Sequence, residues 1–179
     1  MCRFDGYNIN LFAHNEADST SLCHDFITRL YNESLRNVLW SSTDQGICSY
    51  DYRTEDFTRY RIKGNTKDDV CFLNTSAGML LAACSNGLYH YNEQDSLFVP
   101  FLLNEEKPHV RYFAEDGDKT LWIDTNKGLM RYSLEKKQFV SLPTLIQPFA
   151  QQCNNAVLIS SNQLLFNTNN DFFVYHIQS

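Results

Sequence analysis

The sequence lacks long apolar runs and clusters of basic residues. Its longest purely apolar stretch, Met79–Cys84, is far shorter than the roughly 20 residues that a transmembrane helix needs. The 15 lysine and arginine residues are outnumbered by 21 aspartate and glutamate residues, which gives a net charge of −6. Because nucleic-acid phosphates require clustered positive charge, we expect no nucleic-acid partner, and we expect no direct insertion into a membrane.

Signals for metal binding and catalysis are also scarce. None of the six cysteines is spaced as in a usual zinc site, and six are too few to build a disulfide scaffold of this size. Cys48, Cys71 and Cys84 stand in alternating apolar runs and are predicted to be small core residues. The chain contains no nucleophile-elbow, zinc-protease, P-loop or dinucleotide-binding motif. We therefore predict no cofactor, no metal and no catalytic residue.

The composition is that of a globular protein built from strands. Apolar residues make up 43% of the 179 residues and charged residues 20%, which suffices for one domain with a core. No window shows a sustained helical apolar stripe bounded by capping residues. Short runs rich in Val, Ile, Leu, Phe and Tyr alternate with Asn, Asp, Ser and Gly, which predicts an all-β protein with many short strands.

The chain repeats itself with a period of 41 residues. Residues 39–50, 80–91 and 121–132 match without a gap, and a weaker copy follows at residues 164–175. The three strong copies share a glycine, a tyrosine and a phenylalanine at fixed positions: Gly46, Gly87 and Gly128; Tyr50, Tyr91 and Tyr132; and Phe57, Phe98 and Phe139. Trp40 and Trp122 lie two periods apart, and this periodicity favours packing between repeats over ligand stacking for both side chains.

Each period divides into four strands, called A to D. In the first period they are predicted at Phe26–Asn32, Val38–Thr43, Gly46–Tyr50 and Phe57–Arg61. Four strands in about 40 residues are typical of a β-propeller blade, and strand A is expected to be innermost. We predict about four four-stranded antiparallel blades in one incomplete propeller that forms an open arc. The end of a preceding blade is expected at residues 1–12, with a lone outer strand at 7–12, followed by blades at 26–61, 70–101 and 110–142 and a partial blade at 155–177.

The sequence supports two further predictions, one for the B–C turns and one for an acidic A–B turn. Gly46, Gly87 and Gly128 each follow a tight turn between strands B and C, where a left-handed backbone would favour glycine. The acidic residues 115–118 are compatible with a calcium loop, but the twelfth position counted from Asp116 is Lys127 instead of the glutamate of an EF-hand. An ordinary turn between strands A and B is therefore predicted there.

The third copy, Leu-Trp-Ile-x-Thr-x-x-Gly-Leu-x-Arg-Tyr followed by Phe139, resembles the two-component regulator propeller repeat. Arg3–Asn8 similarly resembles the first blade end of sensors built from this repeat. The resemblance covers essentially the whole chain and implies the periplasmic sensor region of a bacterial hybrid two-component system histidine kinase, with an oligosaccharide as its ligand. The chain itself has no kinase segment and no signal peptide, so a fragment of such a sensor or a truncated product is expected. The family often has glycine before the threonine that ends strand B, where this chain has Ser42, Ala83 and Asp124.

Topology indicates where a ligand would bind. Because strands alternate in direction, the loops from strand D to the next strand A and the B–C turns lie at one end of the blades, and such loops often carry function. The candidate ligand-binding residues at this rim are Asp44, Gln45, Asn86, Asn126 and Lys127. The alternative is a protein-interaction or structural propeller without a small-molecule ligand, which associates with itself or with the remaining blades of a longer chain. A propeller enzyme is the least favoured reading because the rim has no evident acid–base pair.

Overall fold

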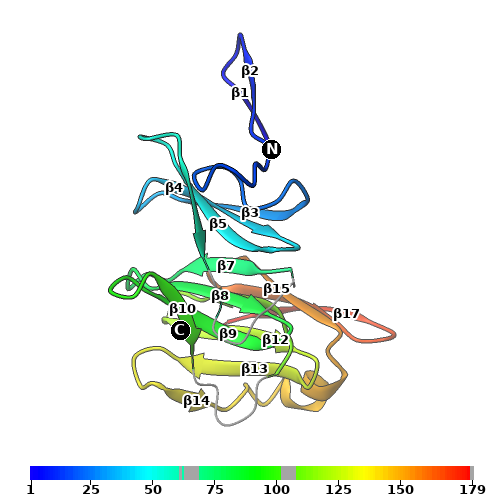
Figure 1. Cartoon of the computed structure of the whole chain (residues 1–179). Coiled ribbons are helices and arrows are strands. Elements are labelled where there is room, and N and C mark those ends of the chain that lie inside the picture. The colour runs from blue at the N-terminus through cyan, green and yellow to red at the C-terminus, as the bar shows by residue number, and fades with distance from the viewer. Residues whose placement is uncertain (61, 63–68, 102–107, 178–179) are drawn as a thin grey trace.

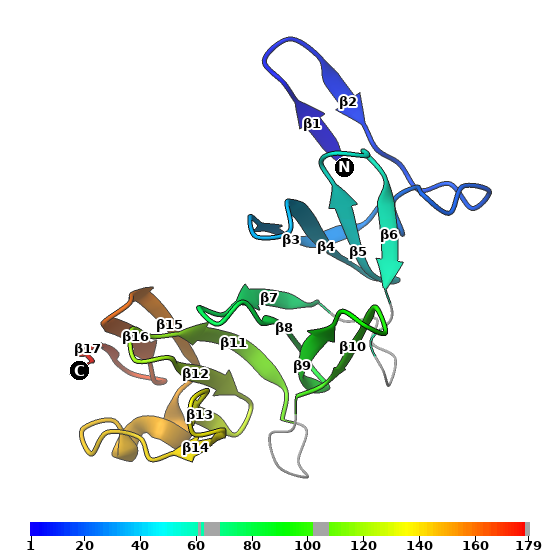
Figure 2. The same cartoon turned by 90° about the vertical axis from the view of Figure 1, so that its left-hand side faces the viewer.

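The strands form successive antiparallel sheets in chain order. The computed structural model describes residues 1–60, 62, 69–101 and 108–177. Within these residues lie one two-stranded hairpin, three four-stranded sheets and one three-stranded sheet. We call the sheets of three or four strands blades 1 to 4, and Figures 1 and 2 show them following one another along an arc.

The strands agree with the all-β propeller class that the repeat predicts. Blade 1 contains β3 (Ile27–Glu33), β4 (Val38–Thr43), β5 (Gly46–Asp51) and β6 (Phe57–Tyr60). Blade 2 contains β7 (Cys71–Asn74), β8 (Leu80–Cys84), β9 (Gly87–Asn92) and β10 (Leu97–Pro100). Blade 3 contains β11 (Val110–Glu115), β12 (Thr120–Thr125), β13 (Gly128–Ser133) and β14 (Gln138–Val140). Blade 4 contains β15 (Asn155–Ser160), β16 (Gln163–Asn167) and β17 (Phe172–His176).

Two details fall outside this prediction. A 3-10 helix, η1 (Gln147–Gln152), lies in the loop between blades 3 and 4, where the sequence indicated no helix. Arg61, the predicted last residue of the fourth strand of blade 1, lies outside the described residues.

The first strand of each blade is innermost, as predicted. β7 contacts β3 on one side and β11 on the other, and β11 also contacts β15. The sheets then run outward in chain order, so β6, β10 and β14 form the outer edges of blades 1 to 3. This arrangement brings the starts of successive A strands together along the inside of the arc.

The N-terminal residues differ from the expected lone outer strand. β1 (Cys2–Phe4) precedes β2 (Ile9–Leu11) and pairs with it antiparallel, with Phe4 opposite Ile9. The expectation was wrong because three residues before a tight turn are too short to show a strand pattern. The hairpin lies beyond blade 1, far from β17 in both views (Figures 1 and 2). In the described residues β2 pairs with β1 and β17 pairs with β16, so these strands do not join into a ring of four.

The core consists of apolar layers between blades. Trp40, Ile47, Leu80, Tyr89 and Phe98 form the layer between blades 1 and 2. A second layer around Leu81 and Leu121 joins blades 2 and 3, and a third around Trp122 and Leu164 joins blades 3 and 4. Trp40 and Trp122 are each 1% exposed, which confirms their predicted packing role. Of the three predicted core cysteines, Cys48 and Cys84 are buried and Cys71 is half-buried.

Each buried tryptophan donates a hydrogen bond to a buried carboxylate. Trp40 Nε1 lies 2.7 Å from Glu33 Oε2, and Trp122 Nε1 lies 2.8 Å from Asp116 Oδ2. Blade 2 has Leu81 at the tryptophan position, and neither Asn74 nor Thr75, which lie one period from Glu33 and Asp116, is acidic. The acid and the tryptophan are thus present or absent together, because a buried carboxylate without its donor would cost free energy.

The acidic segment at 115–118 forms the predicted turn between strands A and B. Asp116 Oδ1 accepts hydrogen bonds from the amides of Asp118 and Thr120, at 3.0 and 2.9 Å. With the bond from Trp122, both oxygens of this carboxylate are engaged within the blade.

The three repeated glycines have the predicted left-handed backbone. Their φ angles are +133° at Gly46, +121° at Gly87 and +110° at Gly128. In blade 3 the Thr125 hydroxyl donates to the carbonyl of Gly128 at 2.7 Å and accepts from the amide of Lys127 at 3.1 Å. The threonine that ends strand B therefore holds the turn that requires the glycine.

Candidate functional site

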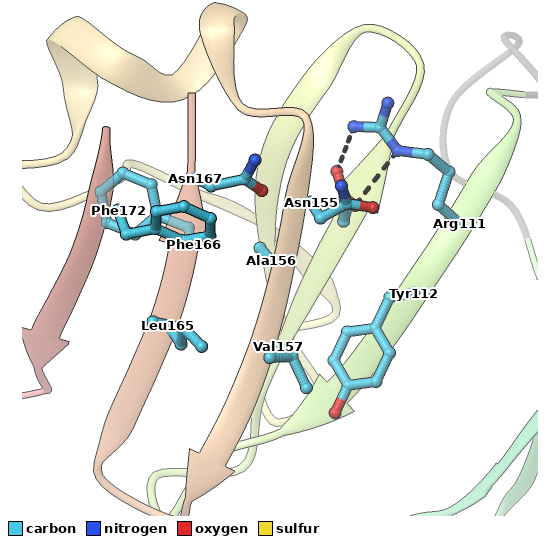
Figure 3. A pocket seen from close by; sticks show the side chains of 10 residues that line it. Arg111, Tyr112, Asn155, Ala156, Val157, Leu165, Phe166, Asn167 and Phe172 are labelled. Atoms are coloured by element: carbon cyan, nitrogen blue, oxygen red, sulfur yellow. Dashed lines mark hydrogen bonds and ion pairs between the residues drawn. The ribbon is translucent and has the colours of Figure 1, made fainter. Parts of the chain in front are cut away.

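A pocket of about 480 Å³ lies between blades 3 and 4. It is formed by the starts of β11, β15 and β17 and by the ends of β12 and β16, so it opens at the end of the blades where the sequence placed the binding rim. Its walls are drawn in Figure 3 and consist of Arg111, Tyr112, Asp124, Asn155, Ala156, Val157, Leu165, Phe166, Asn167 and Phe172.

A β-bulge places the arginine of this pocket. In the ladder between β11 and β12, Val110 pairs with Thr125 and Tyr112 with Asp124, so Arg111 has no partner of its own. A bulge changes the direction of the side chain it carries. Blade 1 has the same irregularity at Thr28, whose hydroxyl lies 3.1 Å from the hydroxyl of Ser42. Blade 3 thus carries an ion pair where blade 1 carries two hydroxyl groups.

The ion pair joins a half-buried arginine to a buried carboxylate. Arg111 Nε lies 3.1 Å from Asp124 Oδ2, and its Nη2 also donates to the carbonyl of Cys153 at 3.1 Å. Asp124 is 1% exposed, and this burial raises the pKa of its carboxyl group while the guanidinium of Arg111 opposes the rise. The pair therefore fixes the arginine against the loop that leads into blade 4.

The remaining walls combine aromatic rings with amides. In Figure 3, Arg111 and Tyr112 line one side, Phe166 and Phe172 line the other, and the side chain of Asn155 lies between them. Burial raises the pKa of Tyr112, so its hydroxyl stays neutral. Asn155 and Asn167 each offer donors and acceptors, and the rings offer apolar faces. This arrangement suits an uncharged polar ligand with apolar ring faces.

The five predicted rim residues lie in the B–C turns and do not line this pocket. Gln45, Asn86, Asn126 and Lys127 are exposed, and Asp44 is half-buried with its Oδ1 2.5 Å from Nδ1 of His24. Asn126 ties its turn to the preceding loop, because its Oδ1 accepts from the amide of His109 at 3.1 Å. The five residues share an end of the blades with the pocket, and their role in binding stays a prediction.

Sequence reasoning missed the pocket residues themselves. One signal pointed to them: Asp124 is a charged residue inside the otherwise apolar strand Leu121–Thr125, at a position where the related repeats often have glycine. A charge at such a position requires a partner, and the bulge residue Arg111 supplies it. Within the described ranges, no group of three or more His, Cys, Asp or Glu side chains could hold a metal ion.

Solved structures with the same fold include extracellular domains of hybrid two-component systems and enzymes. The chain is 20% identical to the extracellular domain of a B. thetaiotaomicron protein described as a hybrid two-component system, with a TM-score of 0.70 over 95% of this chain and 23% of that one. A second such domain from B. thetaiotaomicron is 15% identical, with a TM-score of 0.68 over 98% of this chain and 27% of that one. A virginiamycin B lyase from Staphylococcus aureus is 15% identical, with a TM-score of 0.55 over 89% and 59% of the two chains.

These likenesses agree with the β-propeller fold of the four blades. The chain spans about a quarter of the two extracellular domains it matches. No protein-family model matches it, and no curated protein matches its sequence. Across the described residues, no helix has the length and apolar character needed to cross a membrane.

Proposed function

We propose that the chain is a ligand-sensing propeller segment of a periplasmic, hybrid two-component sensor, and that it binds an oligosaccharide in the pocket between blades 3 and 4. The observation that carries this proposal is the combination of Asn155 and Asn167 with the rings of Phe166 and Phe172 around one pocket. Sugar hydroxyls need paired donors and acceptors, and sugar rings present apolar faces to aromatic side chains. The fold shared with extracellular domains of hybrid two-component systems supports the sensor role.

The proposed segment is non-catalytic. Among the described residues that line the pocket, Asp124 is the one carboxylate, and Arg111 engages both of its oxygens. General acid–base chemistry usually requires a second titratable group within reach of the substrate. The signal would instead pass as a conformational bias to the kinase of the longer protein.

We expect Phe172→Ala to weaken oligosaccharide binding by about tenfold or more. Phe172 lines the pocket and is 81% exposed, so its truncation removes a contact surface for the ligand at little cost in stability. The measurement is calorimetric titration of the chain with a panel of plant and host glycan oligosaccharides. Val174→Ala is the matched control, because Val174 is an exposed residue of the same strand outside the pocket.

Two outcomes would contradict the proposal. The absence of a binding signal with every oligosaccharide of the panel would count against sugar sensing. An equal loss of affinity in both variants would show that the ligand does not bind in this pocket. Chromatographic detection of oligosaccharide turnover by the same protein would show that the segment is catalytic.

A second candidate function, that of a protein-interaction or structural module, is supported by a separate observation on the N-terminal hairpin. Cys2, Phe4, Ile9 and Leu11 lie on one face of the β1–β2 hairpin, because the pairs Cys2–Leu11 and Phe4–Ile9 are directly opposed. All four side chains are exposed. The other face is tied to blade 1 through Arg3, which donates to the hydroxyl of Tyr50 at 2.7 Å. An exposed apolar face of this kind tends to recruit a partner, here a second copy or further blades of a longer chain.

We expect the isolated chain to self-associate through this face. Sedimentation velocity should show a sedimentation coefficient that rises with concentration, and Ile9→Ser with Leu11→Ser should reduce the rise. Leu145→Ser is the control, because Leu145 is 76% exposed in the loop before η1 and lies outside the hairpin. A monomer at every concentration would argue against the interaction module.

A further inference from the structure

Two cysteines that are distant in sequence meet where the loop before β3 packs against blade 1. Cys23 lies in the loop before β3, Cys48 lies in β5, and their sulfur atoms share a hydrogen bond at 2.8 Å. We propose that Cys23 and Cys48 form a disulfide bond that ties this loop covalently to blade 1.

The loop is already held against the blade by the residues that precede Cys23. The amide of Phe57 donates to the carbonyl of Thr20 at 2.9 Å, and Leu22 is 0% exposed in an apolar cluster with Cys48 and Tyr50. Arg59 of β6 donates to the Asp18 carbonyl of the same loop at 3.0 Å. These contacts hold the loop where the two sulfur atoms meet, and distortion of the native geometry is a common reason why engineered disulfides stabilise less than expected.

The two thiols differ in the way that stepwise oxidation requires. The hydrogen bond with Cys48 lowers the pKa of Cys23, which favours its thiolate form, and Cys23 is half-buried with access to solvent. The same contact and burial raise the pKa of Cys48, which stays a buried thiol. Thiolates are the attacking species in disulfide exchange, so Cys23 reacts first and Cys48 second.

The oxidant is a disulfide of the glutathione or thiol–disulfide oxidoreductase class. The Cys23 thiolate attacks one sulfur of this disulfide, forms a mixed disulfide and releases one thiolate. The Cys48 sulfur then attacks Cys23, the second thiolate leaves, and the proton of Cys48 is passed to it. The two cysteines lose two electrons and the proton of Cys48, and the oxidant is reduced to two thiols, the first of which takes its proton from solvent. This chemistry is favoured in the extracytoplasmic compartment proposed above, although the bond can be tested independently of any ligand.

Peptide mapping tests the bond directly in the folded wild-type chain. After equilibration in oxidised glutathione, alkylation and digestion with trypsin, we expect residues 4–29 and 37–53 to be joined, because each peptide contains a single cysteine. The joined mass should be two hydrogens below the sum of the separate peptides, and the other four cysteines should be alkylated. Alkylation of both Cys23 and Cys48 in this buffer, or a link from either to another cysteine, would overturn the proposal.

Thermal unfolding supplies a second readout. A disulfide closing a loop of about 25 residues should raise the unfolding midpoint by roughly 5–12 °C over the reduced protein. Cys23→Ser should abolish this difference, whereas Cys71→Ser, at another half-buried cysteine, should retain it. Equal midpoints for oxidised and reduced wild type, with the peptides joined, would show that the bond forms without constraining the loop and would overturn its proposed structural role.

Discussion

Gly128→Ala is expected to lower the free energy of unfolding by roughly 2–5 kcal/mol. The backbone at Gly128 has φ +110°, which strains any residue with a Cβ atom. In addition, a Cβ atom at this position would lie 2.4 Å from the carbonyl oxygen of Ala150 in η1. That oxygen belongs to the backbone, so the helix between blades 3 and 4 must move to admit the methyl group.

The variant Gly46→Ala separates the backbone strain from the steric overlap with Ala150. Gly46 has φ +133° at the equivalent turn of blade 1, but the nearest atom to an added Cβ is the carbonyl oxygen of Tyr60 at an ordinary 3.6 Å. This variant should therefore lose only the strain contribution, roughly 1–3 kcal/mol. Urea unfolding of both variants provides the measurement. Equal losses would show that the approach of η1 to Gly128 has no energetic consequence.

The same glycine shows how far the sequence predicts the fold. Three glycines at one phase of a 41-residue period, each after a polar turn, were enough to predict strands, turns and positive φ angles. The contact with Ala150 was not predictable, because η1 lies in a loop outside the repeat. Periodic residues report the interactions that every blade makes, whereas a loop that occurs once leaves no pattern to compare.

The candidate site was also hard to predict because its residues do not repeat from blade to blade. The turn residues were selected because they are polar and lie in the B–C turns of the three strong repeats, yet the pocket is formed where residues of two different blades meet. Asn155 and Asn167 belong to the degraded fourth copy, and aligning that copy with the others does not show which of its side chains face a pocket shared with blade 3. Asp124 was visible as a departure from the family pattern, but its partner Arg111 lies at a bulge, and a bulge breaks the alternation from which side-chain directions are predicted.

Loss of the ion pair in this pocket should have the second large effect. Arg111→Met keeps the length of the side chain but leaves Asp124, 1% exposed, without its counter-charge. Breaking a buried pair from one side costs about 3–5 kcal/mol, and a value near 3 is expected because the arginine side chain is 31% exposed. Adding Asp124→Ala, the residue that blade 2 carries as Ala83, should recover most of the loss in urea unfolding at neutral pH.

The pH dependence of these variants identifies the buried charge as the cause. Burial raises the pKa of Asp124 in the folded chain, so its favourable contribution is complete below pH 3.8, its ordinary pKa, and is lost as the pH rises through the folded value. Arg111 opposes this rise of the pKa, and its removal therefore extends the loss to higher pH. The destabilisation by Arg111→Met should be small near pH 4 and should grow toward pH 7, whereas the double variant should show no such growth. A destabilisation of the same size at both pH values would mean that the arginine stabilises the pocket through its packing and its bond to the Cys153 carbonyl, and that the charge of Asp124 is unimportant.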